Sequence, residues 1–253
     1  MHLTTKGLVL RVSPYNDTDA MLTLLTAEHG KISAKARGLR RRNSPMAAPC
    51  QLLAYGNFTL FEYKGNFTIN EASSIEIFDN LRRDLTKLSL GSYFAQVAEI
   101  LSQEDLPSPA ILSLVLNCLY ALANLNVDQL HVKSVFELRS ACIAGYFPDL
   151  TGCHICADQN PDLILISEGR LECSACRNQA FRGIRLPVSP GVLSAMRYIC
   201  HCDSKKLFQF QLPQERMQEL CDITEAYLCA QLERGFSALD FYKSLFYNQQ
   251  FSN

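Results

Sequence analysis

Lys31-Ile-Ser-Ala-Lys-Ala-Arg-Gly-Leu-Arg-Arg-Arg42 places six basic residues and no acidic residue in twelve positions, in a chain of 253 residues whose formal net charge is −1. Its first seven residues alternate in character: Lys31, Ser33, Lys35 and Arg37 are polar, whereas Ile32, Ala34 and Ala36 are apolar. Successive side chains of a β-strand point to opposite faces. The pattern therefore predicts a strand with one packed face and one face lined by cations.

The positive charge continues beyond this strand. Arg40, Arg41 and Arg42 follow Gly38, and Pro45 comes shortly after them. Proline cannot donate a hydrogen bond to a sheet. We therefore expect the three arginines on a loop at the rim of the sheet.

Four further strand-like segments surround the basic strand, at residues 7–12, 21–26, 52–63 and 66–78. Each is rich in β-branched or aromatic residues or alternates in polarity, and turn residues separate them. Five short strands predict a small closed barrel such as the OB-fold, whose open face and loops commonly bind oligonucleotides. Three rings of the fourth segment share one face and add planar surfaces beside the cations: Tyr55, Phe61 and Tyr63.

The net charge is close to zero, so attraction to a polyanion must come from the local cluster and not from the whole molecule. Phosphate is the commonest cellular polyanion. We therefore predict that six residues contact nucleic acid: Lys31, Lys35, Arg37, Arg40, Arg41 and Arg42. Two alternatives stay open, namely a solvated face without a ligand and a negatively charged protein or membrane partner.

Four cysteines have the spacing of a metal site. Cys153-His-Ile-Cys156 and Cys173-Ser-Ala-Cys176 are two Cys-x-x-Cys pairs separated by sixteen residues, with hairpin-like sequence between them. This spacing is typical of tetrahedral thiolate zinc. Four protein ligands leave no open position for water, so we predict one structural Zn²⁺ ion held by Cys153, Cys156, Cys173 and Cys176.

Other readings of the cysteines are weaker but remain open. The four thiols can be unrelated buried residues or a redox pair, and Cys200-His-Cys202 is a lesser metal candidate. The chain has eleven cysteines, an odd number, and several lie singly in apolar patterns. We therefore expect a reducing compartment and no disulfide framework.

After residue 80 the apolar residues recur at helical spacing. Ser108-Pro109 is typical of a helix start, residues 132–142 and 217–228 form apolar stripes, and Ser237 begins a last helix. The sequence predicts a multidomain α+β protein in which an α-helical domain with an inserted zinc ribbon follows the five-stranded OB-fold barrel. The expected boundaries are 1–80 for the barrel, 81–150 and 183–253 for the two parts of the helical domain, and 151–182 for the ribbon.

Positive signs of catalysis are missing from the sequence. It contains no phosphate-binding loop, dinucleotide fingerprint, His-Glu-x-x-His or Gly-x-Ser-x-Gly motif. The longest apolar run, 111–127, contains four polar residues and is shorter than a membrane span. We expect a binding protein, not an enzyme, without a membrane anchor or a secretory signal.

Two blocks of sequence resemble a known family. Lys6-Gly-Leu-Val-Leu-Arg-Val-Ser-Pro-Tyr-Asn-Asp-Thr-Asp19, continued by Ala36-Arg-Gly-Leu-Arg-Arg41, is similar to the start of the bacterial recombination mediators of the RecO family. Phe136-Glu-Leu-Arg-Ser-Ala-Cys-Ile-Ala-Gly-Tyr-Phe-Pro-Asp-Leu150 is the second block, and it leads into the first cysteine pair. With both pairs, the resemblance covers the chain in order.

The resemblance implies a function as well as a fold. Proteins of this family bind single- and double-stranded DNA, anneal complementary strands and pair with RecR. They contact the acidic C-terminal tail of SSB and help to load RecA onto SSB-coated single strands. It also implies a bacterial cytoplasmic, nucleoid-associated protein that hydrolyses no nucleotide.

The SSB tail is acidic with an apolar end, so its site should be a hydrophobic groove bordered by cations. Lys133, Arg139 and Arg197 lie on helical segments and are the predicted partner-binding residues. Two alternatives for the whole chain remain: a zinc-ribbon OB-fold factor that binds RNA or acts in transcription, and a metalloenzyme.

Overall fold

The computed structural model describes residues 2–177 and 179–250. The chain folds into two compact units, residues 1–125 with 236–253 and residues 126–235. The four-part division expected from the sequence remains a prediction.

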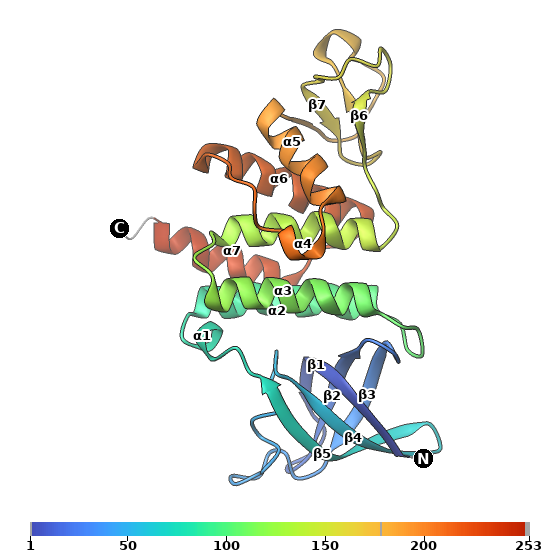
Figure 1. Cartoon of the computed structure of the whole chain (residues 1–253), viewed down its shortest axis with the longest axis vertical. Coiled ribbons are helices and arrows are strands. Elements are labelled where there is room, and N and C mark those ends of the chain that lie inside the picture. Colours follow the sequence, from blue (N-terminus) through green and yellow to red (C-terminus); the bar gives the residue numbers. More distant parts are fainter. Residues whose placement is uncertain (1, 178, 251–253) are drawn as a thin grey trace. The chain divides into compact units, whose positions relative to one another are not determined.

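A closed five-stranded barrel begins the first unit (Figure 1). Its strands are β1 (His2–Pro14), β2 (Ala20–Thr26), β3 (Lys31–Ala36), β4 (Tyr55–Tyr63) and β5 (Asn66–Glu76). They follow the order β1-β2-β3-β5-β4, and β1 pairs with β4 to close the sheet. The pair β3–β5 is parallel and the other pairs are antiparallel. This is the predicted OB-type barrel, and the fold class is confirmed.

The interior of the barrel is formed by the apolar positions of the alternating pattern, including Val9, Leu22, Ile32, Phe58 and Leu60. The fourth strand starts later than the sequence indicated, because residues 52–54 form a turn before Tyr55. Leu53 has a φ of 64° there, which is incompatible with an extended strand.

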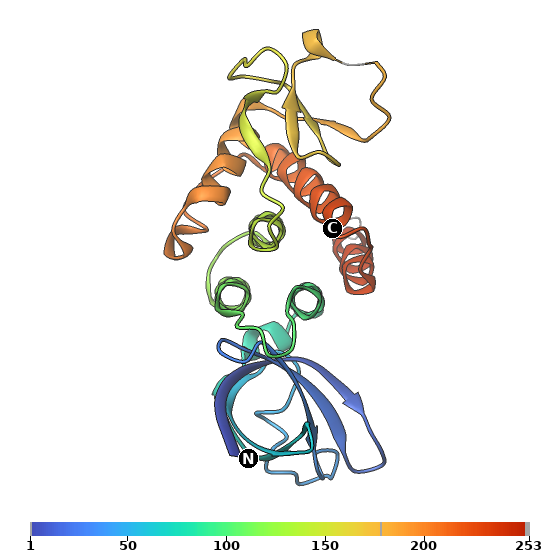
Figure 2. The ribbon, with the colours of Figure 1, turned by 90° about the vertical axis from the view of Figure 1, so that its right-hand side faces the viewer.

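In the described ranges, four helices complete the first unit: α1 (Asp79–Arg82), α2 (Leu85–Leu101), α3 (Pro109–Asn124) and α7 (Ser237–Gln250). Figure 2 shows α2 and α3 end-on beside each other. Gly30, in the turn between β2 and β3, has a φ of 61° and fits closely against the carbonyl groups of Gln103 and Leu106. A side chain would not fit there, so this contact fixes the start of β3 against the loop between α2 and α3.

The described part of the second unit contains three helices and a small sheet. The helices are α4 (Gln129–Ile143), α5 (Pro190–His201) and α6 (Gln214–Gln231). The strands are β6 (Asp149–Cys153), β7 (Leu163–Leu165), β8 (Arg170–Glu172) and β9 (Arg185–Pro187), in the order β6-β8-β7-β9. The 3₁₀ turns η1 (Ser174–Cys176) and η2 (Ser204–Lys206) follow β8 and α5. The hairpin β7–β8 was expected between the cysteine pairs, whereas β6 and β9 were not.

Between residues 2 and 250, leaving out residue 178, no helix combines the length and the apolar character that crossing a bilayer requires.

Candidate nucleic-acid interface and metal centre

β3 carries the basic row in the predicted orientation. Ile32, Ala34 and Ala36 are buried in the barrel, while Lys31 and Lys35 are partly exposed on its outer face. The alternation therefore identified the correct face. What each cation contacts depends on residues far away in the sequence.

Both lysines of this row are held by groups of the same unit. Lys35 forms an ion pair with Asp19, with 3.0 Å between Nζ and Oδ2. Lys31 donates from Nζ to the backbone carbonyl of Glu99 in α2, at 3.0 Å. The charge of Lys35 is thus balanced by a carboxylate, which the local sequence did not indicate.

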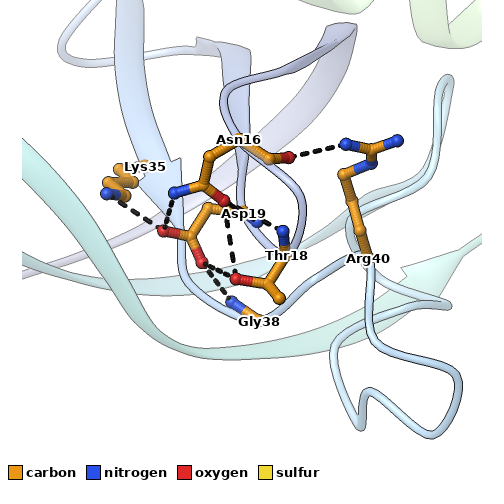
Figure 3. Close-up of polar contacts among 6 residues, drawn as sticks. All are labelled: Asn16, Thr18, Asp19, Lys35, Gly38 and Arg40. Carbon is orange, nitrogen blue, oxygen red and sulfur yellow. Dashed lines mark hydrogen bonds and ion pairs between the residues drawn. The ribbon is translucent and has the colours of Figure 1, made fainter.

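Asp19 connects the turn between β1 and β2 to the segment after β3 (Figure 3). Its carboxylate accepts hydrogen bonds from the backbone N–H of Gly38 at 2.8 Å and from Lys35. Asn16 and Thr18 donate to the same carboxylate from their side chains. These donors, first the N–H of Gly38 and then Lys35, hold the pKa of Asp19 well below its usual range. The carboxylate is therefore ionised at neutral pH.

The arginines divide into one that belongs to this network and three that extend from it. Arg40 donates from Nη1 to the carbonyl oxygen of Asn16 at 2.6 Å (Figure 3). Three others are exposed, and within the described residues their side chains have no ion pair or hydrogen bond: Arg37, Arg41 and Arg42. Three of the six residues predicted to contact nucleic acid therefore present guanidinium groups that are available to a ligand.

Aromatic rings share the outer face with the cations. Lys35 is in register with Thr68 of β5, which pairs with Phe61 of β4, which in turn pairs with His2 of β1. Phe61 is 38% exposed and lies 5.2 Å from the His2 ring, centroid to centroid. Tyr63, two residues further along β4, is exposed. Two of the three rings predicted on β4, Phe61 and Tyr63, therefore reach solvent on the outer face of the barrel, which also carries the row on β3, whereas Tyr55 at the start of β4 is half-buried.

The structure corrects the expectation for Lys133. This residue of α4 is a buried ion-pair partner, not a surface cation. Its side chain is 1% exposed and lies 2.8 Å from carboxylate oxygens of both Glu137 and Glu225. Burial opposes the charged ammonium, but Glu137, Cys221 and Glu225 outweigh that cost and raise the pKa of Lys133. We therefore omit Lys133 from the proposed partner site.

The other two predicted partner residues bind backbone carbonyls of the second unit. Arg139 donates from Nη1 to the carbonyl oxygen of Cys200 at 2.8 Å. Arg197 donates from Nε to the carbonyl oxygen of Leu150 at 2.7 Å and lines a pocket of about 480 Å³ with Phe147. Arg197 therefore lies beside a pocket with apolar side chains, and its role in partner binding stays a prediction.

The four cysteines of the ribbon converge on one point. Their Sγ atoms all lie within 4.8 Å of one another, and in the part of the chain that the structure describes no other group of three or more metal-ligating side chains does so. The Sγ atoms of Cys156 and Cys173 are 3.7 Å apart. A tetrahedron with metal–sulfur bonds of about 2.3 Å has edges of about 3.8 Å. The cluster therefore fits a metal ion in both donor type and spacing.

The electrostatics of the four thiols also favour a cation. Burial opposes ionisation of Cys153, but backbone N–H groups, including that of Cys173, lower its pKa to about 6. The pKa of Cys173 is raised by burial and then by its neighbours Cys153 and Cys156. Several thiolates cannot share this space without a positive ion that offsets their mutual repulsion.

The lesser metal candidate is not such a cluster. Cys200 lies in α5, with its Sγ 3.7 Å from that of Cys142 in α4, and Cys202 is a half-buried residue just beyond α5. Among the described residues these thiols join no group that can hold a metal ion. The interpretation of Cys200-His-Cys202 as a metal site is therefore not supported.

Sequence reasoning missed Asp19 and Tyr15. Both lie between the first two predicted strands, among turn residues that carry no basic charge. Lys35 lies over the Tyr15 ring, with 4.3 Å between Nζ and the ring centroid. An acidic residue and a ring in a turn gave no signal, because their contacts come from Lys35 of β3 and from Gly38 in the segment after β3.

These features define a class of protein. It is an OB-fold barrel with an exposed arginine segment, joined to helices that carry a four-thiol ribbon able to hold a metal ion.

Comparison with known proteins assigns the family. The family model for "Recombination protein O N terminal" matches residues 1–78, and that for "Recombination protein O C terminal" matches residues 82–240. The DNA repair protein RecO of Acetivibrio thermocellus is 31% identical over 246 residues, which cover 96% of this chain and 97% of that protein. The chain belongs to the RecO family of DNA repair and recombination proteins.

More distant relatives agree along nearly the whole length. The DNA repair protein RecO of Alkaliphilus metalliredigens is 28% identical over 248 residues, covering 97% of this chain and 100% of that protein. That of Bacillus subtilis is 27% identical over 223 residues, covering 88% and 86%.

Proposed function

We propose that this protein is a recombination mediator that binds single- and double-stranded DNA and anneals complementary strands. With RecR, it helps to load RecA onto SSB-coated single strands. The observation that carries the DNA-binding part is the exposed segment of Arg37, Arg41 and Arg42 on the barrel of a RecO-family chain. The roles of RecR, SSB and RecA rest on the family.

Annealing follows from neutralisation of phosphate charge. Two strands repel each other until base pairing begins, and a protein that binds phosphates of both lowers that repulsion. In this proposal Arg41 and Arg42, on the loop, bind phosphates of one DNA strand. Arg37, at the end of β3, binds phosphates of the other strand. Lys31, Lys35 and Arg40 act mainly by holding the face and the loop in place. Such contacts are blind to sequence.

The ribbon is proposed to hold one Zn²⁺ ion through Cys153, Cys156, Cys173 and Cys176. Four thiolates fill the coordination sphere, so the ion would stabilise the ribbon and activate no water molecule. We therefore expect no catalysis at this site.

The arginine segment supports a quantitative prediction. Replacing Arg37, Arg41 and Arg42 together with alanine should lower the affinity for single-stranded DNA about 100-fold at low salt, because three phosphate contacts and their released counterions are lost. The measurement is fluorescence anisotropy with a labelled oligonucleotide. A matched control removes three positive charges from other places, Arg83, Lys205 and Lys206. It should change the affinity less than about 3-fold.

The same assay tests the chief alternative. An RNA of the same sequence should compete less well than the DNA if the protein is a DNA repair factor. Preferential binding of RNA would instead favour an RNA-binding or transcription-associated factor.

The pocket beside Arg197 is the proposed site for the SSB tail. Its lining includes the apolar Phe147, Pro148 and Leu150, the guanidinium group of Arg197 and the carboxylate of Asp149. The apolar surface and the guanidinium group suit a peptide with an apolar end and acidic residues. Replacing Arg197 with alanine should weaken binding of a tail peptide about 10-fold. Arg139, which the sequence also indicated as a partner residue, does not line this pocket, so Arg139→Ala serves as the control and should bind the peptide as wild type does. Equal affinities of wild type and Arg197→Ala in isothermal titration calorimetry would place the tail elsewhere.

A further inference from the structure

Tyr15 presents one open aromatic face at the turn between β1 and β2. The residue is 60% exposed. The Lys35 ammonium lies over its ring, 4.3 Å from the centroid, and so occupies one face. A cation held over an aromatic face is attracted to the ring, and the ring is thereby restrained. The opposite face is left to solvent or to a ligand.

The ring and its cation are fixed by the same residue. The carboxylate of Asp19 binds the Lys35 ammonium at 3.0 Å (Figure 3). The backbone carbonyl of Asp19 accepts a hydrogen bond from the N–H of Tyr15, also at 3.0 Å. The backbone N–H of Tyr15 and the Lys35 ammonium over its ring therefore both bind Asp19. A ring restrained in this way loses little conformational freedom when a planar ligand stacks on it.

Tyr15 is also tied to the arginine segment. Asp19 accepts from the N–H of Gly38 at 2.8 Å, and Arg40 donates to the carbonyl of Asn16, the residue after Tyr15, at 2.6 Å. The backbone N–H of Arg40 donates to the carbonyl of Thr18 at 2.9 Å. The turn and the segment that carries the free guanidinium groups therefore form one assembly.

We propose that Tyr15 is a stacking site for one unpaired nucleobase of a single strand whose phosphates are bound by the neighbouring arginines. This inference rests on the proposed DNA binding. A planar base has the shape and polarizability that an open tyrosine face accepts, and stacking of this kind tolerates any base. A duplex keeps its bases stacked inside the helix. The stacking site therefore distinguishes single strands from duplexes, whereas the arginines bind the phosphates of both.

The chain contains no tryptophan, which allows a direct test. Tyr15→Trp introduces a single indole that keeps the flat face and the contact with Lys35. Adding single-stranded DNA should quench and shift its emission, because a stacked base contacts the indole, while a duplex at the same fractional saturation should leave it nearly unchanged. Tyr120→Trp is the control, since Tyr120 is 52% exposed on α3 of the same unit. Its emission should respond to neither ligand.

Affinities provide the second test. Tyr15→Ala should weaken binding to single-stranded DNA about 10-fold and to duplex less than about 2-fold, whereas Tyr15→Phe should match wild type for both. Asp19→Asn should weaken single-strand binding by a smaller factor, because Lys35 and the ring lose part of their anchorage. Circular dichroism and melting temperature check that each variant is folded. If Tyr15→Ala does not fold, the emission of Tyr15→Trp decides.

The possible results separate this inference from the proposed function. If wild type binds neither DNA form, the proposed function fails. If wild type binds single strands and Tyr15→Ala binds them equally well, the proposed stacking site is refuted while the proposed DNA binding stands. Equal losses of affinity for single strands and duplexes in Tyr15→Ala would also refute the stacking site, because they would show that the ring supports phosphate binding only.

Discussion

Replacing Lys133 with alanine should lower the free energy of unfolding by about 3–5 kcal/mol, the usual cost of removing one partner from a buried ion pair. The side chain of Lys133 is 1% exposed and that of Glu137 is 0% exposed, with 2.8 Å between Nζ and Oε1. Glu225 contributes a second carboxylate at 2.8 Å, and Thr224 donates to the other oxygen of Glu137 at 2.8 Å. Without the ammonium, α4 would bury a carboxylate beside α6 with no cation.

This loss should depend on pH. Burial raises the pKa of Glu137 above its ordinary value even with Lys133 present, and removing the cation raises it further. A carboxyl whose pKa is higher in the folded state stabilises that state at low pH and destabilises it as pH rises. The deficit of Lys133→Ala should therefore be smaller at about pH 5 than at about pH 8.

Urea denaturation followed by circular dichroism measures both effects. Lys205→Ala, at an exposed lysine of the same unit, should change the stability by less than about 0.5 kcal/mol. The double variant Lys133→Met/Glu137→Leu should recover most of the loss, since apolar residues of similar volume often replace a buried pair at little cost. If Lys133→Ala unfolds within about 1 kcal/mol of wild type at both pH values, the buried ion pair is not what holds α4 to α6.

Cys173→Ser should remove the bound metal ion from the purified protein, reducing about one zinc ion per chain to almost none. A structural zinc ion contributes about 10–16 kcal/mol to the folding of an isolated zinc-finger peptide, so the effect on the ribbon is large. Residues 151–182 should exchange their amide hydrogens rapidly in the variant. The amides of α4 and α6 should keep most of their protection, because those helices pack through their own buried side chains.

Native mass spectrometry and elemental analysis give the metal content. Cys202→Ser is the matched control, because Cys202 lies outside the cluster and should leave the metal in place. The assignment is wrong if wild type purified without chelators contains no metal. It is equally wrong if Cys173→Ser retains the same amount as wild type.

The barrel could be predicted because its signal is local. In a small barrel the inward and outward positions alternate along each strand, so the pattern of Ile32, Ala34 and Ala36 was enough to orient β3. The cysteine spacing was equally informative, because a thiolate ribbon sets the separation within each pair.

Tertiary partners could not be predicted from the same signals. Lys35 and Asp19 are sixteen residues apart and meet only because β2 pairs with β3. Lys133 and Glu137 have the i, i+4 spacing of an ordinary exposed helix pair. Most of α4 is buried, including polar residues such as His131 and Ser134, so its sequence has no clear polar face to show which charges point inward.

The salt dependence of DNA binding tests the central claim most directly. The logarithm of the affinity for a single-stranded oligonucleotide should fall linearly with the logarithm of salt concentration, by about 0.7 for each phosphate contact. The slope of the Arg37→Ala/Arg41→Ala/Arg42→Ala variant should therefore be shallower than that of wild type by about 2. Parallel lines for the two proteins would show that these arginines do not bind phosphate, and would contradict the account.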